Sequence, residues 1–178
     1  MPAWLSLPNI LTLARLASVP FLVNFIHGGR YGHAAVLFFA AAVTDSVDGL
    51  LARRMHAITK FGSYLDPITD KTFLVAVFLA LALRGDAPLW YVSIVFGRDL
   101  AIVAFAAVAL LFTSYRQFTP TRWGKASTFF QIVTAIALVI RGAAPVPFVS
   151  GFAAAALVVS AAVTAWSAVH YAWRAWRS

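Results

Sequence analysis

Six apolar stretches follow one another along this 178-residue chain. Each is close to the length of about twenty residues that an α-helix needs to cross a bilayer. The chain is 62% hydrophobic and only 11% charged, which excludes an ordinary soluble domain. The sequence therefore predicts an all-α, polytopic integral membrane protein in which residues 1–178 form a single membrane domain.

Glycine, proline and charged residues mark the ends of the apolar stretches. We expect a short interfacial segment at residues 2–7, with Trp4 at the level of the lipid head groups. Six transmembrane helices should follow. Their expected limits are residues 8–26, 33–55, 63–83, 89–115, 122–140 and 148–173.

The basic residues give the chain a formal charge of +8 and predict its orientation. They collect in short loops, which argues against an extended nucleic-acid-binding face and follows the positive-inside rule. One side of the predicted bundle carries Arg53, Arg54, Lys60, Arg116, Arg122, Lys125, Arg174 and Arg177. The other side carries Arg30, Arg84 and Arg141. We therefore expect both termini on the cytoplasmic side of a bacterial-type inner membrane.

All six acidic residues are aspartates, and four of them, Asp45, Asp48, Asp66 and Asp70, fall within 26 positions. A carboxylate at bilayer depth costs about 2.5–3.5 kcal/mol on insertion scales, so such a residue faces a counter-ion, a cavity or a metal. Pairing with neighbouring Arg or Lys residues, or capping of a helix by Asp45, would explain a single aspartate. Four together favour a divalent cation. The chain has no cysteine, which excludes thiolate ligands and a thiol nucleophile.

The spacing of these aspartates places them on facing helix strips. Asp45 and Asp48 share one face of the second predicted span with Gly49, Ala52 and Arg53, and Gly62, Asp66 and Asp70 repeat every four residues in the third. A loop of about seven residues makes the two helices antiparallel neighbours, so that the strips can face each other. Such an oxygen-rich volume suits one or two hard cations such as Mg²⁺.

The segment from Asp45 to Asp70 resembles the signature of the CDP-alcohol phosphotransferases. That signature reads D-x-x-D-G-x-x-A-R, then eight residues, then G-x-x-x-D-x-x-x-D. Its fixed positions in this chain are Asp45, Asp48, Gly49, Ala52, Arg53, Gly62, Asp66 and Asp70. The resemblance covers nearly the full length, and it implies a core of six membrane helices that pairs as a homodimer.

The resemblance also implies roles for these residues. Asp45, Asp48, Asp66 and Asp70 would bind Mg²⁺ or Mn²⁺, as two ions, and Asp70 would act as the general base. The CDP pocket would be lined by Gly49, Ala52, Arg53 and Gly62, with Arg53 near the phosphates. For Gly49 and Gly62, close helix packing stays open as an alternative role. Asn9 and Thr12, three positions apart near the N-terminus, fit two interpretations, an edge of this pocket and a polar helix start. The reaction would release CMP and form a new phosphodiester lipid.

The opening Leu7-Pro8-Asn9-Ile10-Leu11-Thr12-Leu13-Ala14-Arg15 resembles the members that use CDP-diacylglycerol as the donor. Their acceptor is glycerol 3-phosphate or phosphatidylglycerol. Arg98 and Asp99 lie deep in the fourth span, as an acceptor site or as a local charge pair. In the fourth span this chain has the sequence Arg98-Asp99 and lacks a second arginine two turns further on. This pattern slightly favours a cardiolipin synthase over a phosphatidylglycerophosphate synthase. Lys125 is the main candidate for the acceptor phosphate, with Arg98, Arg116 and Arg122 as further candidates. A basic loop residue that only follows the positive-inside rule is the open alternative for Lys125.

Two other functions stay open. A family member could use another acceptor, such as inositol phosphate. A divalent-cation transporter would also need aspartates in the membrane, but it should carry them along a path through the whole bilayer. In this chain four of the six aspartates gather at one end of the predicted bundle.

Overall fold

The computed structural model describes residues 7–54, 60–112 and 122–176, and within them the side chains of residues 10–44, 69–104 and 122–173. The regular secondary structure of this part of the chain is entirely α-helical, with short connections at residues 28–30, 84–88 and 144–146. Its helices are α1 (Leu7–His27), α2 (Tyr31–Arg54), α3 (Lys60–Leu83), α4 (Leu89–Phe112), α5 (Arg122–Ala143) and α6 (Pro147–Trp176). Each predicted span coincides with one helix to within three residues at either end. The interfacial segment with Trp4 lies outside the described residues.

Three of these helices contain described stretches that are long and apolar enough to cross a membrane, namely Ile10–His27, Arg122–Ala143 and Pro147–Trp173. The described apolar stretch of α2, Tyr31–Thr44, is shorter. The all-α fold and the three candidate spans agree with the sequence analysis. A crossing by all six helices stays a prediction.

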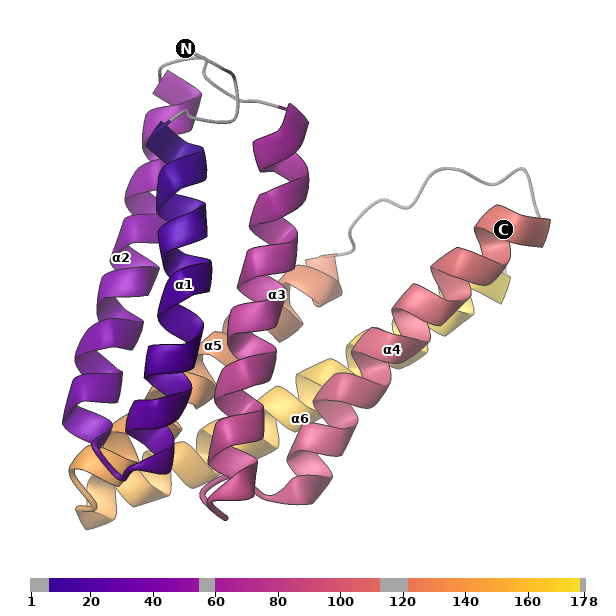
Figure 1. Cartoon of the computed structure of the whole chain (residues 1–178). Coiled ribbons are helices and arrows are strands. Elements are labelled where there is room, and N and C mark those ends of the chain that lie inside the picture. The colour runs from indigo at the N-terminus through magenta and orange to yellow at the C-terminus, as the bar shows by residue number, and fades with distance from the viewer. Residues whose placement is uncertain (1–6, 55–59, 113–121, 177–178) are drawn as a thin grey trace.

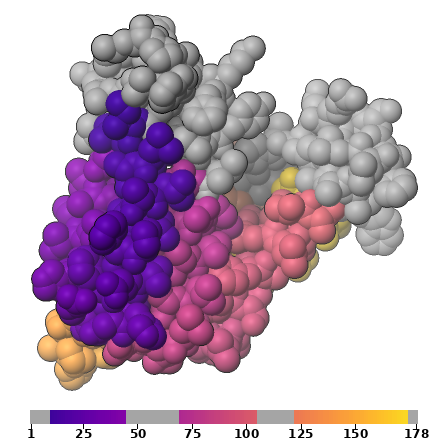
Figure 2. Space-filling model, viewed as in Figure 1, coloured from indigo at the N-terminus to yellow at the C-terminus, as the bar shows by residue number. Residues whose placement is uncertain are grey.

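The helices form two groups that α5 joins (Figure 1). In the first group α1 packs against both α2 and α3, and in the second α6 packs against α4 and α5. Helix α5 also packs against α2 and α3. On the face shown in Figure 2, side chains of α1, α3 and α4 make a continuous surface over the lower half of the molecule. A cavity lined by side chains of α1, α2, α3 and α5 lies where the two groups meet.

Glycine turns end α1 and α3 at the same end of the bundle. Gly29 and Gly85 have φ angles of 71° and 81°, a conformation that glycine adopts without a side-chain clash. After α1, the Arg30 amide donates to the Phe25 carbonyl over 2.8 Å, and after α3 the Asp86 amide donates to the Leu81 carbonyl over 2.8 Å. Both turns are Schellman motifs, which satisfy the last carbonyls of each helix.

Asp86 joins the helices at this end of the bundle through its hydrogen bonds and an ion pair. The Tyr31 hydroxyl donates to its carboxylate, and Arg141 donates to its backbone carbonyl over 2.5 Å. Arg84 pairs with the same carboxylate over 3.5 Å and donates to the His27 carbonyl over 2.6 Å. We call this set the loop-end cluster. It fixes α1, α2, α3 and α5 at the end of the bundle that lies away from Arg54 and Lys60.

Polar contacts also hold the second group together. The Tyr91 hydroxyl lies 2.8 Å from Ser160 Oγ, joining α4 to α6, and Ser127 Oγ lies 2.9 Å from Thr164 Oγ1, joining α5 to α6. All four side chains are buried. Because a buried hydroxyl without a partner is costly, these pairs fix how the three helices align.

Candidate active site

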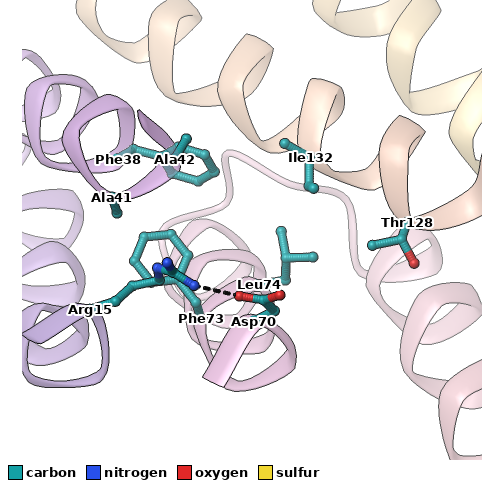
Figure 3. A pocket seen from close by; sticks show the side chains of 9 residues that line it. All are labelled: Arg15, Phe38, Ala41, Ala42, Asp70, Phe73, Leu74, Thr128 and Ile132. Carbon is teal, nitrogen blue, oxygen red and sulfur yellow. Dashed lines mark hydrogen bonds and ion pairs between the residues drawn. The ribbon is translucent and has the colours of Figure 1, made fainter. Parts of the chain in front are cut away.

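A cavity of about 250 Å³ lies where four helices meet (Figure 3). Its lining residues are Arg15 from α1, Phe38, Ala41 and Ala42 from α2, Asp70, Phe73 and Leu74 from α3, and Thr128 and Ile132 from α5. Most of these side chains are apolar. Asp70, the residue that the sequence analysis singles out as the base, therefore stands on the wall of an apolar cavity.

Asp70 is held by an arginine from α1. Arg15 Nη1 donates to Asp70 Oδ1 over 2.7 Å (Figure 3). The Arg15 side chain is 5% exposed, whereas that of Asp70 is 49% exposed. The Arg15 side chain is thus buried in the protein interior, whereas the Asp70 carboxylate is accessible from the cavity.

The remaining aspartates of the signature belong to the same two helices. The side chains of Asp45, Asp48 and Asp66 lie outside the described residues, as do those of Gly49, Ala52, Arg53 and Gly62. Their helix positions are described: Asp45 and Asp48 follow the cavity residue Ala41 by four and seven positions in α2, and Asp66 precedes Asp70 by four in α3. These intervals keep one helix face. Asp45 lies inside α2, so it does not cap that helix at its start.

The predicted facing of the polar strips of α2 and α3 involves side chains outside the described residues and stays a prediction. Helix α1 packs against both, while α2 and α3 meet through the rings of Phe38 and Phe73, whose centroids lie 5.3 Å apart. Because α1 takes up one side of both helices, a space stays open between them. That space is the cavity beside Asp70.

An apolar space continues from this cavity between α2 and α5. A second cavity of about 170 Å³ shares Phe38 and Ala42 with the first. Its other lining residues are Ala35, Phe39, Ile136, Val139 and Ile140. Along α2 and α5 these residues lead away from Asp70 toward the loop-end cluster. The site thus has the Arg15–Asp70 ion pair at one end and apolar side chains along the rest of its length.

Arg98 and Asp99 form a charge cluster beside α3. Arg98 Nη1 pairs with Asp99 Oδ1 over 2.9 Å and Arg98 Nη2 donates to Ser167 Oγ over 3.1 Å. Lys71 of α3 pairs with the other oxygen of Asp99. Of the two interpretations from the sequence, the local charge pair matches these contacts. Arg98 here connects α4 to α6.

Two of the other acceptor candidates, Arg122 and Lys125, lie at the start of α5. Arg122 and Lys125 are exposed, and Lys125 precedes the cavity residue Thr128 by one turn. Arg116 lies outside the described residues. Of the two proposed edges of the CDP pocket, Thr12 is buried one turn before Arg15, and the side chain of Asn9 lies outside the described residues.

Among the described side chains, no three potential metal ligands converge. Asp70 is the one member of the proposed metal set whose side chain is described, and it is a carboxylate that faces a cavity. The set as a whole consists of carboxylates, which are the ligands that hard divalent cations prefer. On donor chemistry and helix position, these residues fit such a cation.

Sequence reasoning missed Arg15 and the apolar lining of the cavity. Arg15 interrupts an otherwise apolar helix, and the same cost argument that singles out the aspartates applies to it. Phe38, Ala42 and Ile132 carry no such signal, because an apolar residue facing a cavity looks the same in a sequence as one facing lipid.

Comparisons with known proteins agree with the signature. The model of the CDP-alcohol phosphatidyltransferase family matches residues 5–169 of the chain. A probable phosphatidylglycerophosphate synthase of Mycobacterium tuberculosis is 36% identical over 97% of this chain and 82% of the relative. A CDP-diacylglycerol–glycerol-3-phosphate 3-phosphatidyltransferase of Bacillus subtilis is 31% identical over 97% and 96%. A CMP-forming cardiolipin synthase of Oryza sativa is 32% identical over 99% of this chain and 59% of the relative.

Proposed function

We propose, because the chain belongs to the CDP-alcohol phosphatidyltransferase family, that it transfers the phosphatidyl group of CDP-diacylglycerol to a glycerol-type acceptor and releases CMP. The observation that carries this proposal is the position of Asp70. Its half-exposed carboxylate stands at one end of an apolar space that runs between α2 and α5. That arrangement suits a reacting phosphate attached to a diacylglycerol.

A divalent metal is used across the family, and the aspartates of α2 and α3 would hold it here. Asp45, Asp48, Asp66 and Asp70 are the proposed ligands, for Mg²⁺ or Mn²⁺. When bound, the metal would neutralise charge on the pyrophosphate and on the departing CMP. Arg53, Gly49, Ala52 and Gly62 lie on the same helices and are the proposed contacts for the cytidine diphosphate.

The residues of the chain supply the proton chemistry. We assign Asp70 as the base that takes the proton of the acceptor hydroxyl as its oxygen attacks the β-phosphorus, the one that carries the diacylglycerol. The bond from that phosphorus to the CMP oxygen then breaks. The apolar side chains of Phe38, Phe73 and Leu74 line the cavity beside Asp70 and limit the water that it holds, which favours transfer to the acceptor over hydrolysis.

For the acceptor we favour glycerol 3-phosphate, with phosphatidylglycerol as the second candidate. The two named phosphatidylglycerophosphate-forming relatives match over 82% and 96% of their own length, against 59% for the rice cardiolipin synthase. Arg122 and Lys125 also stand together at the start of α5, and a compact dianion needs more than one cation. This reverses the slight preference that the Arg98–Asp99 pair gave, since that arginine is engaged with Asp99 and Ser167.

We further propose that the Asp70 end of the bundle faces the cytoplasm of a bacterial-type cell, that both termini lie there, and that the protein is a homodimer. A soluble acceptor and the soluble product CMP would then reach the site directly. A divalent-cation transporter is disfavoured, because Asp86 is part of the loop-end cluster and Asp99 is paired with Arg98.

The acceptor is tested by CMP release from purified protein in mixed micelles with CDP-diacylglycerol and Mg²⁺. Glycerol 3-phosphate and phosphatidylglycerol are supplied in separate reactions. We expect release with glycerol 3-phosphate. Release with phosphatidylglycerol alone would identify a cardiolipin synthase, and release with neither but with inositol phosphate would show that another acceptor is used.

A further inference from the structure

A buried polar network joins α5 to α6 beside the candidate active site. The Ser127 and Thr164 hydroxyls lie 2.9 Å apart, and Gln131 Nε2 donates to Ser127 Oγ over 3.1 Å and to Thr164 Oγ1 over 3.4 Å. All three side chains are fully buried. We propose that this network fixes the rotation of α5 about its axis and thereby decides which α5 residues face the cavity. Its effect on turnover rests on the proposed function.

The network and the cavity use adjacent residues of α5. Ser127 and Gln131 face α6. The residue that follows each of them, Thr128 and Ile132 respectively, lines the cavity (Figure 3). Successive residues lie about 100° apart around a helix, so a rotation of that size would exchange the two pairs. Lys125 lies three positions before Thr128 and therefore on the same side of the helix, so the rotation of α5 also places the main acceptor candidate.

Polar contacts select one rotation of a membrane helix better than apolar contacts do. Lipid tails are as apolar as leucine or isoleucine side chains, so an apolar helix face loses little when it turns from protein to lipid. The other sides of α5 include exposed apolar residues such as Phe129 and Ile140. A buried hydroxyl or amide that turns toward lipid loses its partner, which is costly. The strip formed by Ser127 and Gln131 therefore favours the orientation in which it meets Thr164.

Stability alone explains this network poorly. Among the described groups, none donates to Gln131 Oε1. A buried acceptor without a donor costs free energy, and apolar side chains of similar shape often replace a polar network without loss of stability. A network that only stabilises the fold should lower Tm on removal and leave kcat/KM per folded molecule unchanged. A network that orients α5 should lower kcat/KM while Tm changes little.

The first test measures the orientation of α5 without using activity. The chain has no cysteine, so a single Thr128→Cys reports access from the cavity to a water-soluble maleimide. Its labelling rate is compared with and without the changes Ser127→Ala, Gln131→Leu and Thr164→Val, which together we call the apolar variant. We expect labelling at least about threefold slower in the apolar variant, since one interhelical hydrogen bond in a membrane protein shifts populations by about that factor.

Two controls accompany the labelling. Phe129→Cys places the thiol on the exposed neighbour of Thr128, outside the cavity lining, and its labelling should not be slower in the apolar variant. Ser167→Ala removes another buried hydroxyl of α6, one that accepts from Arg98 of α4 and makes no printed contact with α5. It should leave the labelling rate of Thr128→Cys unchanged.

The second test replaces the network by a covalent lock. Ser127→Cys and Thr164→Cys, combined with Gln131→Leu, place two thiols where the hydroxyls are in contact, near the β-carbon spacing of about 3.5–4.5 Å that a disulfide needs. In the CMP-release assay, the oxidised form should have a kcat/KM for glycerol 3-phosphate within about twofold of the wild type. The reduced form and the apolar variant should be at least about threefold lower, with a Tm of the apolar variant within about 2 °C of the wild type.

Each result decides for or against the inference. Equal labelling of Thr128→Cys in both backgrounds, or slower labelling of Thr128→Cys and Phe129→Cys alike, would overturn it. Failure of the disulfide to form, a kcat/KM of the oxidised form as low as that of the reduced form, or a lower Tm at unchanged kcat/KM would overturn it as well. If the wild type releases no CMP with any acceptor, the proposed function fails, and the labelling rates alone decide whether the network orients α5.

Discussion

Replacing Asp99 by Asn tests whether the charge cluster beside α3 is structural. Asp99 lies between Arg98 and Lys71, and Arg98 also donates to Ser167. Asn keeps the shape of the side chain and removes its charge. Two cations, one of them largely buried, are then left close together without a counter-charge.

The size of the effect follows from burial. Arg98 and Asp99 are 12% and 15% exposed and 2.9 Å apart. At an effective dielectric constant of about 20 their attraction is about 6 kcal/mol before desolvation, and loss of one partner of a buried pair costs about 3–5 kcal/mol. Lys71 is 38% exposed, so solvent screens its pairing and it adds less than about 1 kcal/mol. For Asp99→Asn we therefore expect the free energy of unfolding to fall by about 3 kcal/mol. For a chain of this size, that loss of about 3 kcal/mol corresponds to a decrease of about 6–12 °C in Tm.

Tryptophan fluorescence during heating reads this loss directly in detergent. Asp99→Asn should unfold about 6–12 °C below the wild type, and adding Arg98→Met should restore part of the loss. Ser167→Ala, which removes one hydrogen bond to Arg98, is the control and should cost about 1 kcal/mol. A Tm of Asp99→Asn within 2 °C of the wild type, or no recovery in the double variant, would refute the structural interpretation and return Arg98 to the acceptor site.

Other substitutions separate the site from the scaffold. A Cβ at Gly142 would overlap the ring of Tyr31, so Gly142→Ala should cost about 1–3 kcal/mol in unfolding free energy without changing kcat. The control is Gly151→Ala, which has open space around it and should not destabilise the protein. Equal Tm values for the two variants would contradict the packing at the loop-end cluster. Ala42→Phe should raise KM for CDP-diacylglycerol at least about fivefold by filling both cavities, whereas the neighbouring, exposed Val43→Phe should not; equal KM values would place the lipid elsewhere. Lys125→Met should raise KM for glycerol 3-phosphate about tenfold and leave KM for the donor unchanged, and an unchanged acceptor KM would remove Lys125 from the site.

The sequence predicts the helices well because their causes are local. Apolar runs of span length, ended by Gly29 and Gly85 in left-handed turns, set the limits of α1 and α3 to within three residues. The signature from Asp45 to Asp70 is also local, since it occupies two consecutive helices. The family that it indicates is confirmed by the match over residues 5–169.

The contacts between distant segments could not be predicted in the same way. The Arg15–Asp70 pair spans 55 positions, and so does the bond from Arg141 to the Asp86 carbonyl. Nothing in the spacing along the chain indicates that α1 packs against both α2 and α3. That arrangement decides where the cavity lies and which partner Asp70 has.

The most direct test of the account compares Asp70→Asn with the wild type in CMP release and in binding of CDP-diacylglycerol, with Mg²⁺ and glycerol 3-phosphate present. We expect metal-dependent release by the wild type, and from Asp70→Asn a rate at least about a hundredfold lower with donor affinity within a few-fold of the wild type. Turnover by Asp70→Asn close to the wild-type rate would contradict the assignment of Asp70 as the base. It would also remove the reason for placing the reaction at this cavity.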